Sequence, residues 1–333
     1  MFTSIVGELI GQLKGWFGRG FILAVWLPVF IFASAAAAVY LAGAGGVGTF
    51  AAVWAQWSAG DKALVSAEFV LAVSLVAFAL EFAQVSITRL FEGYWSGILL
   101  LRSFGDWRRR RFERTLARLN ERLEQLSELI PAEADAERPV TQLKAEMNRL
   151  EEQRLGFPPP DYEAHLMPTR LGNLYKSAEL YPHARYNIDS VVVWSRFREV
   201  LPDAFVGRLQ EVKTAVDFLL LFSLLSFVFS LLSVPYLLVR GAQPSLVLAC
   251  AGGFPLAWLA YRAALSPAQA YAELLKVAFD LHRKALLKAL GLRVPDTLTQ
   301  EKALWREVSD FIFRGIEPAE DWEFDATPAK KDA

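Results

Sequence analysis

The sequence predicts an all-α integral membrane protein with four transmembrane helices and a cytoplasmic helical domain. Two observations lead to this prediction. Apolar residues make up 54% of the 333 residues and are gathered in long blocks, a pattern typical of membrane spans. A polar stretch with helical periodicity separates the second block from the third, and we assign it to a domain outside the membrane.

The composition argues against several classes of protein. The net charge is −1, so no overall field favours nucleic acid. The single cysteine, Cys250, can form no intrachain disulfide, and the three histidines have no metal-ligand spacing. Gly43–Gly48 fits a dinucleotide-binding pattern, but it follows a span and no βαβ unit surrounds it. We expect no catalytic residues, no metal site and no cofactor, and hence a protein that is not an enzyme.

The first hairpin begins after residues 1–20, which we interpret as an amphipathic helix lying in the membrane interface. An ordinary buried helix is the alternative. Phe21 to about Ala42 is the first span, and the aromatic segment Phe50–Trp57 fits the outer interface. The second span begins near Ser66, and its helical pattern continues to Phe104, so residues 21–105 comprise a hairpin and a helical stalk.

An arginine-rich segment sets the predicted orientation. Seven arginines lie within 20 residues of the end of the second span, whereas the loop 43–65 offers only Lys62. By the positive-inside rule, the block 102–214 and both termini are cytoplasmic, and the protein lies in a bacterial inner membrane. The run Arg108, Arg109, Arg110, Arg111 is also a candidate site for anionic lipid headgroups.

The cytoplasmic block 106–214 opens with two narrow leucine stripes, at 113–130 and 140–155. They predict an antiparallel helical hairpin or a coiled coil between subunits. Over 102–214 the sequence has 16 Arg and 3 Lys against 18 Asp and Glu, which favours solvated helix faces over a nucleic-acid groove. Residues 113–155 are therefore a possible contact for a protein partner.

The second hairpin covers residues 215–263, with spans Val216–Val239 and Ser245 to about Leu259. Ser266-Pro267 is a favourable helix start, and Gly291 a stop. Thr297–Gln300 and Gly315 bracket another helix, so that 264–316 forms C-terminal cytoplasmic helices. The tail 317–333 is acidic, is expected to be disordered at its end, and is a second possible partner contact.

Two groups of residues are candidate functional sites. Met167–Pro202 is rich in aromatics, arginines and turn-formers, with no sustained helical period. It is either a ligand and coupling segment for an anion or a rigid connector, held for instance by an Arg170–Asp189 pair. Its candidates are Arg170, Asn173, Arg185, Tyr186, Asp189 and Trp194. Ionisable or polar residues near the second span are candidates for a pore: Glu81, Gln84, Arg89 and Glu92, the last two as a local pair.

The segment Pro168-Thr-Arg-Leu-Gly-Asn173, with Tyr181-Pro182, Arg185-Tyr186, Asp189 and Trp194, resembles a pattern of uncharacterised bacterial multi-span membrane proteins, and implies no particular activity. The layout of two spans, a helical block, two spans and a tail is also similar to that of bestrophin-type channels, without a shared motif. We expect a homo-oligomeric pore- or channel-like protein in contact with membrane lipids, or, alternatively, a non-conducting scaffold that docks a partner.

Overall fold

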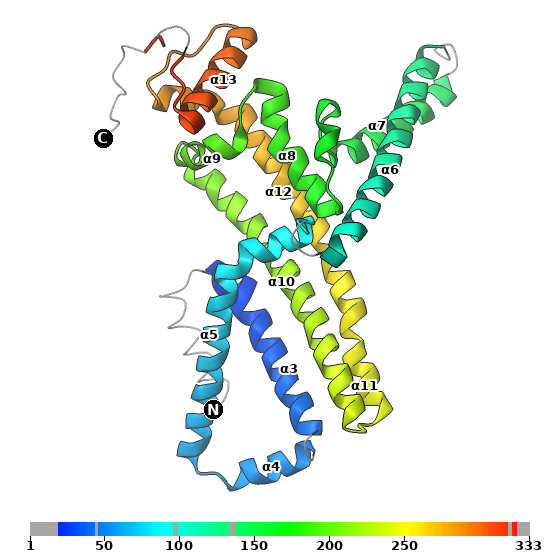
Figure 1. Cartoon of the computed structure of the whole chain (residues 1–333), viewed down its shortest axis with the longest axis vertical. Helices are drawn as coiled ribbons and strands as arrows, with labels where there is room; N and C mark the ends of the chain where they lie inside the picture. The colour runs from blue at the N-terminus through cyan, green and yellow to red at the C-terminus, as the bar shows by residue number, and fades with distance from the viewer. Residues whose placement is uncertain (1–18, 44–45, 96–98, 133–136, 319–321, 325–333) are drawn as a thin grey trace. The chain divides into compact units, whose positions relative to one another are not determined.

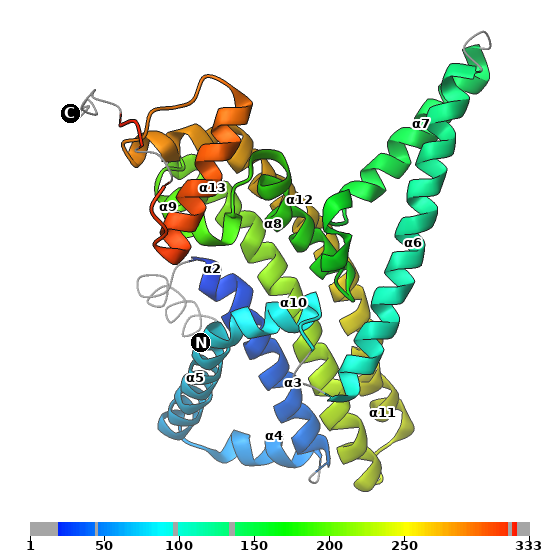
Figure 2. The same ribbon diagram turned by 45° about the horizontal axis from the view of Figure 1, so that its top comes forward.

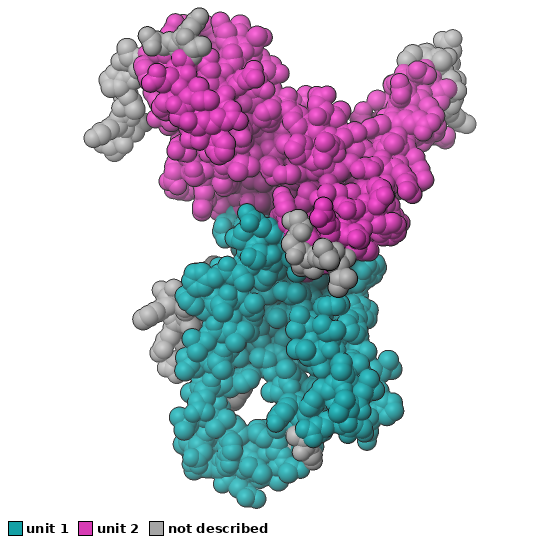
Figure 3. All heavy atoms as spheres, viewed as in Figure 1, with its two compact units in different colours: residues 1–90, 210–267 teal, residues 91–209, 268–333 magenta. Residues whose placement is uncertain are grey.

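The computed structural model describes residues 19–43, 46–95, 99–132, 137–318 and 322–324. Among these residues the chain is helical and contains no β-strand. Residues 1–18 of the predicted amphipathic helix 1–20, residues 133–136 of the linker between the two leucine stripes and the tail from 325 lie outside the described residues. The chain divides into two compact units (Figure 3), unit 1 with residues 1–90 and 210–267, and unit 2 with residues 91–209 and 268–333.

Four of the described helices are long and apolar enough to cross a membrane: Ile22–Gly43, Ala59–Glu92, Asp203–Val239 and Pro244–Ala289. They lie where the sequence placed its four spans. Unit 1 contains the most apolar part of each, which is the composition expected for elements that face lipid.

Unit 1 is built from the helices of both hairpins (Figure 1). The first comprises α2 (Arg19–Phe21), a π-helical turn η1 (Ile22–Trp26), α3 (Leu27–Gly43), α4 (Val47–Gln56) and α5 (Ala59–Glu92). The second comprises α10 (Asp203–Val239) from Gln210 onward, α11 (Pro244–Ala251) and α12 (Gly253–Ala289) as far as Pro267.

Helix α3 contacts both hairpins of unit 1. On one side, Trp26 just before it donates a hydrogen bond from its indole Nε1 to Ser74 Oγ of α5, at 3.1 Å. On the other, the rings of Phe32 and Phe222 of α10 are 5.1 Å apart. Small residues join α10 to the following helices, since Ser230 Oγ donates to the Cys250 carbonyl at 2.7 Å and a Cβ on Gly253 would overlap Ser230. Such close backbone approach is typical of helices packed within membranes.

Unit 2 contains the hairpin of α6 (Leu99–Ala132) and α7 (Glu137–Leu155), the 3₁₀ turn η2 (Pro160–His165), α8 (Arg170–Tyr186), α9 (Ser190–Glu199) and α13 (Leu298–Arg314). The beginning of α10 and the end of α12 complete it. Helices α6 and α7 run side by side and project from the rest of the unit (Figure 2), which confirms the predicted helical hairpin. Arg122 and Glu146 form an ion pair across it at 2.8 Å.

The main core of unit 2 joins segments from both sides of the second hairpin. Phe197 of α9 stacks on Phe279 of α12 with 4.4 Å between the ring centroids. Trp305 of α13 is fully buried in the same cluster, together with Leu286 and Leu287. Thr297 and Gln300 form a capping box at the predicted start of α13, and Gly315 ends this helix in the left-handed conformation.

Three predictions about helix boundaries are wrong. The helix of the second span ends at Glu92, not Phe104, because Gly93 adopts φ +98° and turns the chain. A new helix does not begin at Ser266-Pro267, because α12 continues through both residues and begins instead after Gly252. Ala264 and Ala268, on either side of Pro267, are both buried.

The third error concerns Met167–Pro202. This segment consists mostly of α8 and α9, with Asn187 in the left-handed conformation between them. The face that α8 buries includes Gly172, Asn173 and Ser177 beside Leu171 and Leu174. Because small polar residues occupy part of that face, the apolar period that identifies a helix is missing from the sequence.

Candidate functional site

The start of α8 is fixed to the end of α5 by Thr169. This residue is the N-cap of α8, and its Oγ1 accepts a hydrogen bond from Gly172 N at 2.9 Å. The same hydroxyl donates to the carbonyl oxygen of Glu92, the last residue of α5, at 2.8 Å. One side chain thus satisfies a free amide of one helix and a terminal carbonyl of another.

Asn173 closes the turn that precedes α8. It is 1% exposed, and its Oδ1 accepts from Met167 N at 2.8 Å. Its Nδ2 donates to the carbonyls of Met167 and Thr169, both at 3.0 Å. A buried amide with three bonds to backbone groups has a structural role, as the connector interpretation of this segment requires.

Two glycines allow the backbones to approach here. A Cβ on Gly172 would overlap the Glu92 carbonyl oxygen, and one on Gly93 would overlap the Pro168 ring. Arg108 adds a further bond, from its Nε to the Pro168 carbonyl at 3.3 Å. We call Gly93, Pro168, Thr169, Gly172 and Asn173 the α5–α8 joint.

The other candidates from Met167–Pro202 have separate environments. Arg170 and Arg185 are exposed, and Arg185 lies over the Tyr181 ring at 5.8 Å. Asp189 is the N-cap of α9 and accepts from Val191 N and Val192 N. The suggested Arg170–Asp189 pair is wrong, because the two residues lie at opposite ends of α8, a helix of 17 residues that is about 25 Å long.

Tyr186 belongs to a polar cluster inside unit 2. Its hydroxyl donates to Asp280 at 2.7 Å, and the Arg283 guanidinium lies 4.1 Å from its ring centroid. Arg283 also pairs with the buried Glu301 at 2.7 Å. Burial, followed by the hydrogen bond and charge of Asp280, raises the pKa of Tyr186 to about 12, although Arg283 acts in the opposite direction. We interpret this cluster as structural, because its charges are paired and hydrogen-bonded.

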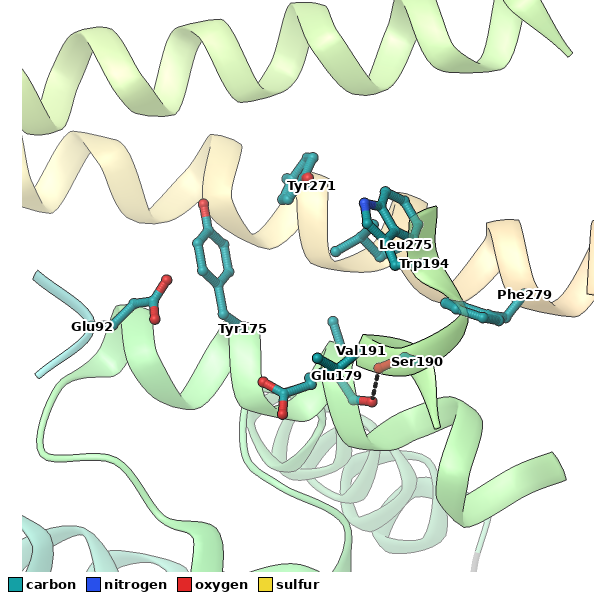
Figure 4. A pocket seen from close by; sticks show the side chains of 10 residues that line it. Glu92, Tyr175, Glu179, Ser190, Val191, Trp194, Tyr271, Leu275 and Phe279 are labelled. Carbon is teal, nitrogen blue, oxygen red and sulfur yellow. Dashed lines mark hydrogen bonds between the residues drawn. The ribbon is translucent and has the colours of Figure 1, made fainter. Parts of the chain in front are cut away.

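Trp194 lines a pocket of unit 2 with a volume of about 330 Å³. Figure 4 shows its wall, in which residues of α8 and α9 face residues of α12, and Glu92 lies at one end. We call it the aromatic pocket, and define it by four rings (Tyr175, Trp194, Tyr271 and Phe279), two carboxylates (Glu92 and Glu179), and Ala178, Ser190, Val191 and Leu275.

The aromatic pocket is held in place by contacts among its own residues. Tyr175 and Tyr271 meet edge to face at 5.8 Å between centroids, and Trp194 lies 6.4 Å from Phe279. Ser190 Oγ donates to the Glu179 carbonyl at 2.7 Å, which ties α9 to α8 (dashed line in Figure 4). The rings therefore need little rearrangement to receive a ligand.

A lysine next to the pocket is engaged by one of its carboxylates. Lys176 Nζ pairs with Glu179 Oε1 at 2.7 Å. Burial acts to lower the pKa of Lys176, but the hydrogen bond and charge of Glu179, with a contribution from Tyr94, outweigh it, and the pKa is raised. The lysine is thus fully charged near neutral pH, and occupies only one of the two Glu179 oxygens.

The candidates on α5 lie in three different environments. Glu81 and Arg89 are exposed, whereas Gln84 is buried and donates from Nε2 to the Asp217 carbonyl of α10 at 3.3 Å. Its Oε1 accepts no hydrogen bond among the described residues. Glu92 instead contributes to the aromatic pocket of unit 2. The Arg89–Glu92 pair stays a prediction.

The arginine run is mostly exposed. Arg109, Arg110 and Arg111 are exposed, while Arg108 is half-buried through its bond to Pro168. Arg102 and Arg109 line a hollow of about 350 Å³ beside Gly93 and Trp95. The lipid-headgroup assignment of the run stays a prediction.

Sequence reasoning identified Trp194 and Glu92, but did not place them in one pocket. Tyr271 and Phe279 lie about 80 residues or more after Trp194, and no pattern in the sequence connects them to α8. One signal was present. Tyr271, Leu275 and Phe279 are spaced four residues apart and therefore share a helix face.

Comparison of the chain with family models, curated proteins and solved structures finds no match. The similarity of layout to bestrophin-type channels gains no further support from these comparisons.

Proposed function

We propose that this chain is the subunit of a homo-oligomeric, pore- or channel-like protein of a bacterial inner membrane, with unit 2 as a cytoplasmic assembly and sensing domain. The observation that carries this proposal is the pair of carboxylates on α5. Glu68 and Glu81 are both exposed, and just 11% of the most apolar window of α5 is buried within the chain.

The distance between these two carboxylates along α5 is shorter than the hydrocarbon core of a membrane is thick. They are 13 residues apart, which corresponds to about 20 Å along a helix, whereas the hydrocarbon core is about 30 Å thick. Tilting α5 shortens the projected distance further. If α5 crosses the membrane, at least one carboxylate therefore lies at hydrocarbon depth, where a charge facing lipid costs several kcal/mol.

An oligomer removes that cost, since neighbouring copies of α5 can enclose a water-filled axis. The two carboxylates are about 140° apart around the helix, so they cannot both face the same axis. We assign Glu81 to the pore ring, where it would favour cations, and Glu68 to a contact between subunits. The arginines that follow α5 support a cytoplasmic position for unit 2.

Exposed arginines also support contact with anionic lipids at the cytoplasmic surface. Arg109, Arg110 and Arg111 present their charges to the surroundings of unit 2. Each Lys or Arg near an anionic membrane surface contributes about 1 kcal/mol to membrane binding.

A current measurement tests the pore. Purified protein reconstituted in planar bilayers should give a cation-selective current, and Glu81→Gln should reduce the selectivity. Glu151→Gln, which removes an exposed charge from α7, should leave selectivity unchanged. The proposal is refuted if a reconstituted oligomer gives no current, or if Glu81→Gln leaves the selectivity unchanged.

The projecting α6–α7 hairpin favours one alternative, a non-conducting scaffold. The two helices expose charged faces along their length, as a docking surface for a protein partner does. Single-particle images separate the two functions, because a ring with α5 at its axis supports the pore, and one copy beside an unlike chain supports the scaffold.

A further inference from the structure

We propose that the aromatic pocket of unit 2 binds a small organic cation, of the class of quaternary ammonium ions and protonated amines. This inference goes beyond the pore and does not depend on it. It requires that the charge, the ring faces and the size of the pocket suit such a ligand.

Both charged side chains that line the pocket are acidic. Its described lining includes the carboxylates of Glu92 and Glu179 and no basic side chain. Lys176 contacts Oε1 of Glu179, so a ligand cation would approach Oε2. Arg170, Arg185 and Arg196 belong to the same segment but are exposed and line no part of this pocket. An anionic ligand would therefore meet repulsion here.

The aromatic faces provide the second attraction. Four of the ten lining residues are aromatic, and each ring face carries the negative end of its quadrupole. A cation within about 6 Å of a ring centroid gains about 0.5–2 kcal/mol per favourable contact. The rings come from α8, α9 and α12, so three helices contribute aromatic side chains to the pocket (Figure 4).

The size and chemistry of the pocket favour an organic cation over a bare calcium ion. Its volume of about 330 Å³ lies at the lower end of small-molecule sites, which span about 300–1,000 Å³. A bare calcium ion needs six to eight oxygen ligands, and the walls here are mainly carbon. A cation that carries its own apolar groups fits both the carboxylates and the rings.

Choline and its uncharged isostere 3,3-dimethyl-1-butanol provide a matched pair of probes. They have nearly the same shape, and differ in the charge at the quaternary centre. Isothermal titration calorimetry on the full-length protein in a non-ionic detergent should show saturable binding of choline, at least tenfold tighter than that of the isostere. Equal binding of the two, or no saturable binding of choline, overturns the proposal.

Variants then locate the binding in this pocket. The double variant Glu92→Gln/Glu179→Gln should weaken choline binding at least tenfold, whereas Glu151→Gln removes a remote charge and should change it less than twofold. Choline binding unaffected by the double variant overturns the proposal.

Two ring variants complete the test. Trp194→Leu should weaken binding about tenfold, and Tyr175→Phe, which retains the ring, should change it less than threefold. If Trp194→Leu does not fold, Tyr175→Leu takes its place, because Tyr175 is partly exposed and lies outside the main core. A folded ring-loss variant with wild-type affinity overturns the proposal.

Discussion

Replacement of Gly172 by alanine tests the α5–α8 joint, because two physical effects predict opposite results. In a helix interior, Gly→Ala stabilises by up to about 1 kcal/mol through backbone entropy. At Gly172, however, the added Cβ would overlap the Glu92 carbonyl oxygen and lie 2.8 Å from Met167 Cβ. Backbone atoms cannot move aside as a flexible side chain can, so we expect the steric term to decide.

The structure gives the magnitude. Overpacking costs about 1–3 kcal/mol, and displacing Glu92 also gives up the hydrogen bond from Thr169, worth about 0.5–1.5 kcal/mol. Subtracting the helix gain leaves a net destabilisation of about 0.5–3.5 kcal/mol. Since each kcal/mol shifts Tm by about 2–4 °C in units of 150–250 residues, a mid-range loss of about 2 kcal/mol lowers Tm by about 4–8 °C.

Gly207→Ala is the matched control. Gly207 lies in α10 within unit 2, and a Cβ there would meet no atom within 4 Å. Helix propensity then acts alone, and the variant should melt about 1–4 °C above wild type. Circular dichroism at a fixed scan rate in detergent measures all three proteins. A Gly172→Ala variant that melts at or above wild type would refute the close approach on which the joint depends.

Two further predictions concern unit 2. Asn173→Ala removes three hydrogen bonds to buried backbone groups and should lower the free energy of unfolding by about 2–3 kcal/mol. Arg170→Ala, at an exposed position, should stay within about 0.5 kcal/mol of wild type. Equal melting temperatures of the two variants would contradict the structural role of Asn173. Because the folded-state pKa of Tyr186 is about 12, against an unfolded value near 10, its protonated form contributes stability fully below pH 10, and this is lost as pH rises towards 12. Melting measured from pH 9 to 11.5 should therefore fall less steeply for Tyr186→Phe, and identical slopes would count against the shift.

The sequence was sufficient for features set by apolar composition and local capping. Four long apolar blocks identified the candidate spans, and Thr297 with Gln300 identified the start of α13. Both signals are local, since span length follows from the helix rise and a capping box lies within one turn.

Features set by tertiary contacts were missed. Gly93 ends α5 beside Pro168, which is 75 residues later in the chain. No residue near Gly93 in the sequence indicates this contact. The sequence of α8 shows no apolar helical period, because Gly172, Asn173 and Ser177 are buried through hydrogen bonds and close packing and not through hydrophobicity. The aromatic pocket combines α8, α9 and α12, so its composition becomes visible after the fold is known.

The stacking of Phe197 on Phe279 has a consequence for how the protein is made. Phe197 is translated before the third and fourth candidate spans, and Phe279 near the end of the helix Pro244–Ala289 that forms the fourth. The core of unit 2 therefore cannot close until the ribosome has synthesised the third span and most of the fourth helix. During that interval the apolar faces of α9 and early α10 lack their final cover, and nascent chains in this state are prone to aggregate. A chain that stops after α10 would keep those faces uncovered, and is expected to become a substrate for cellular proteases.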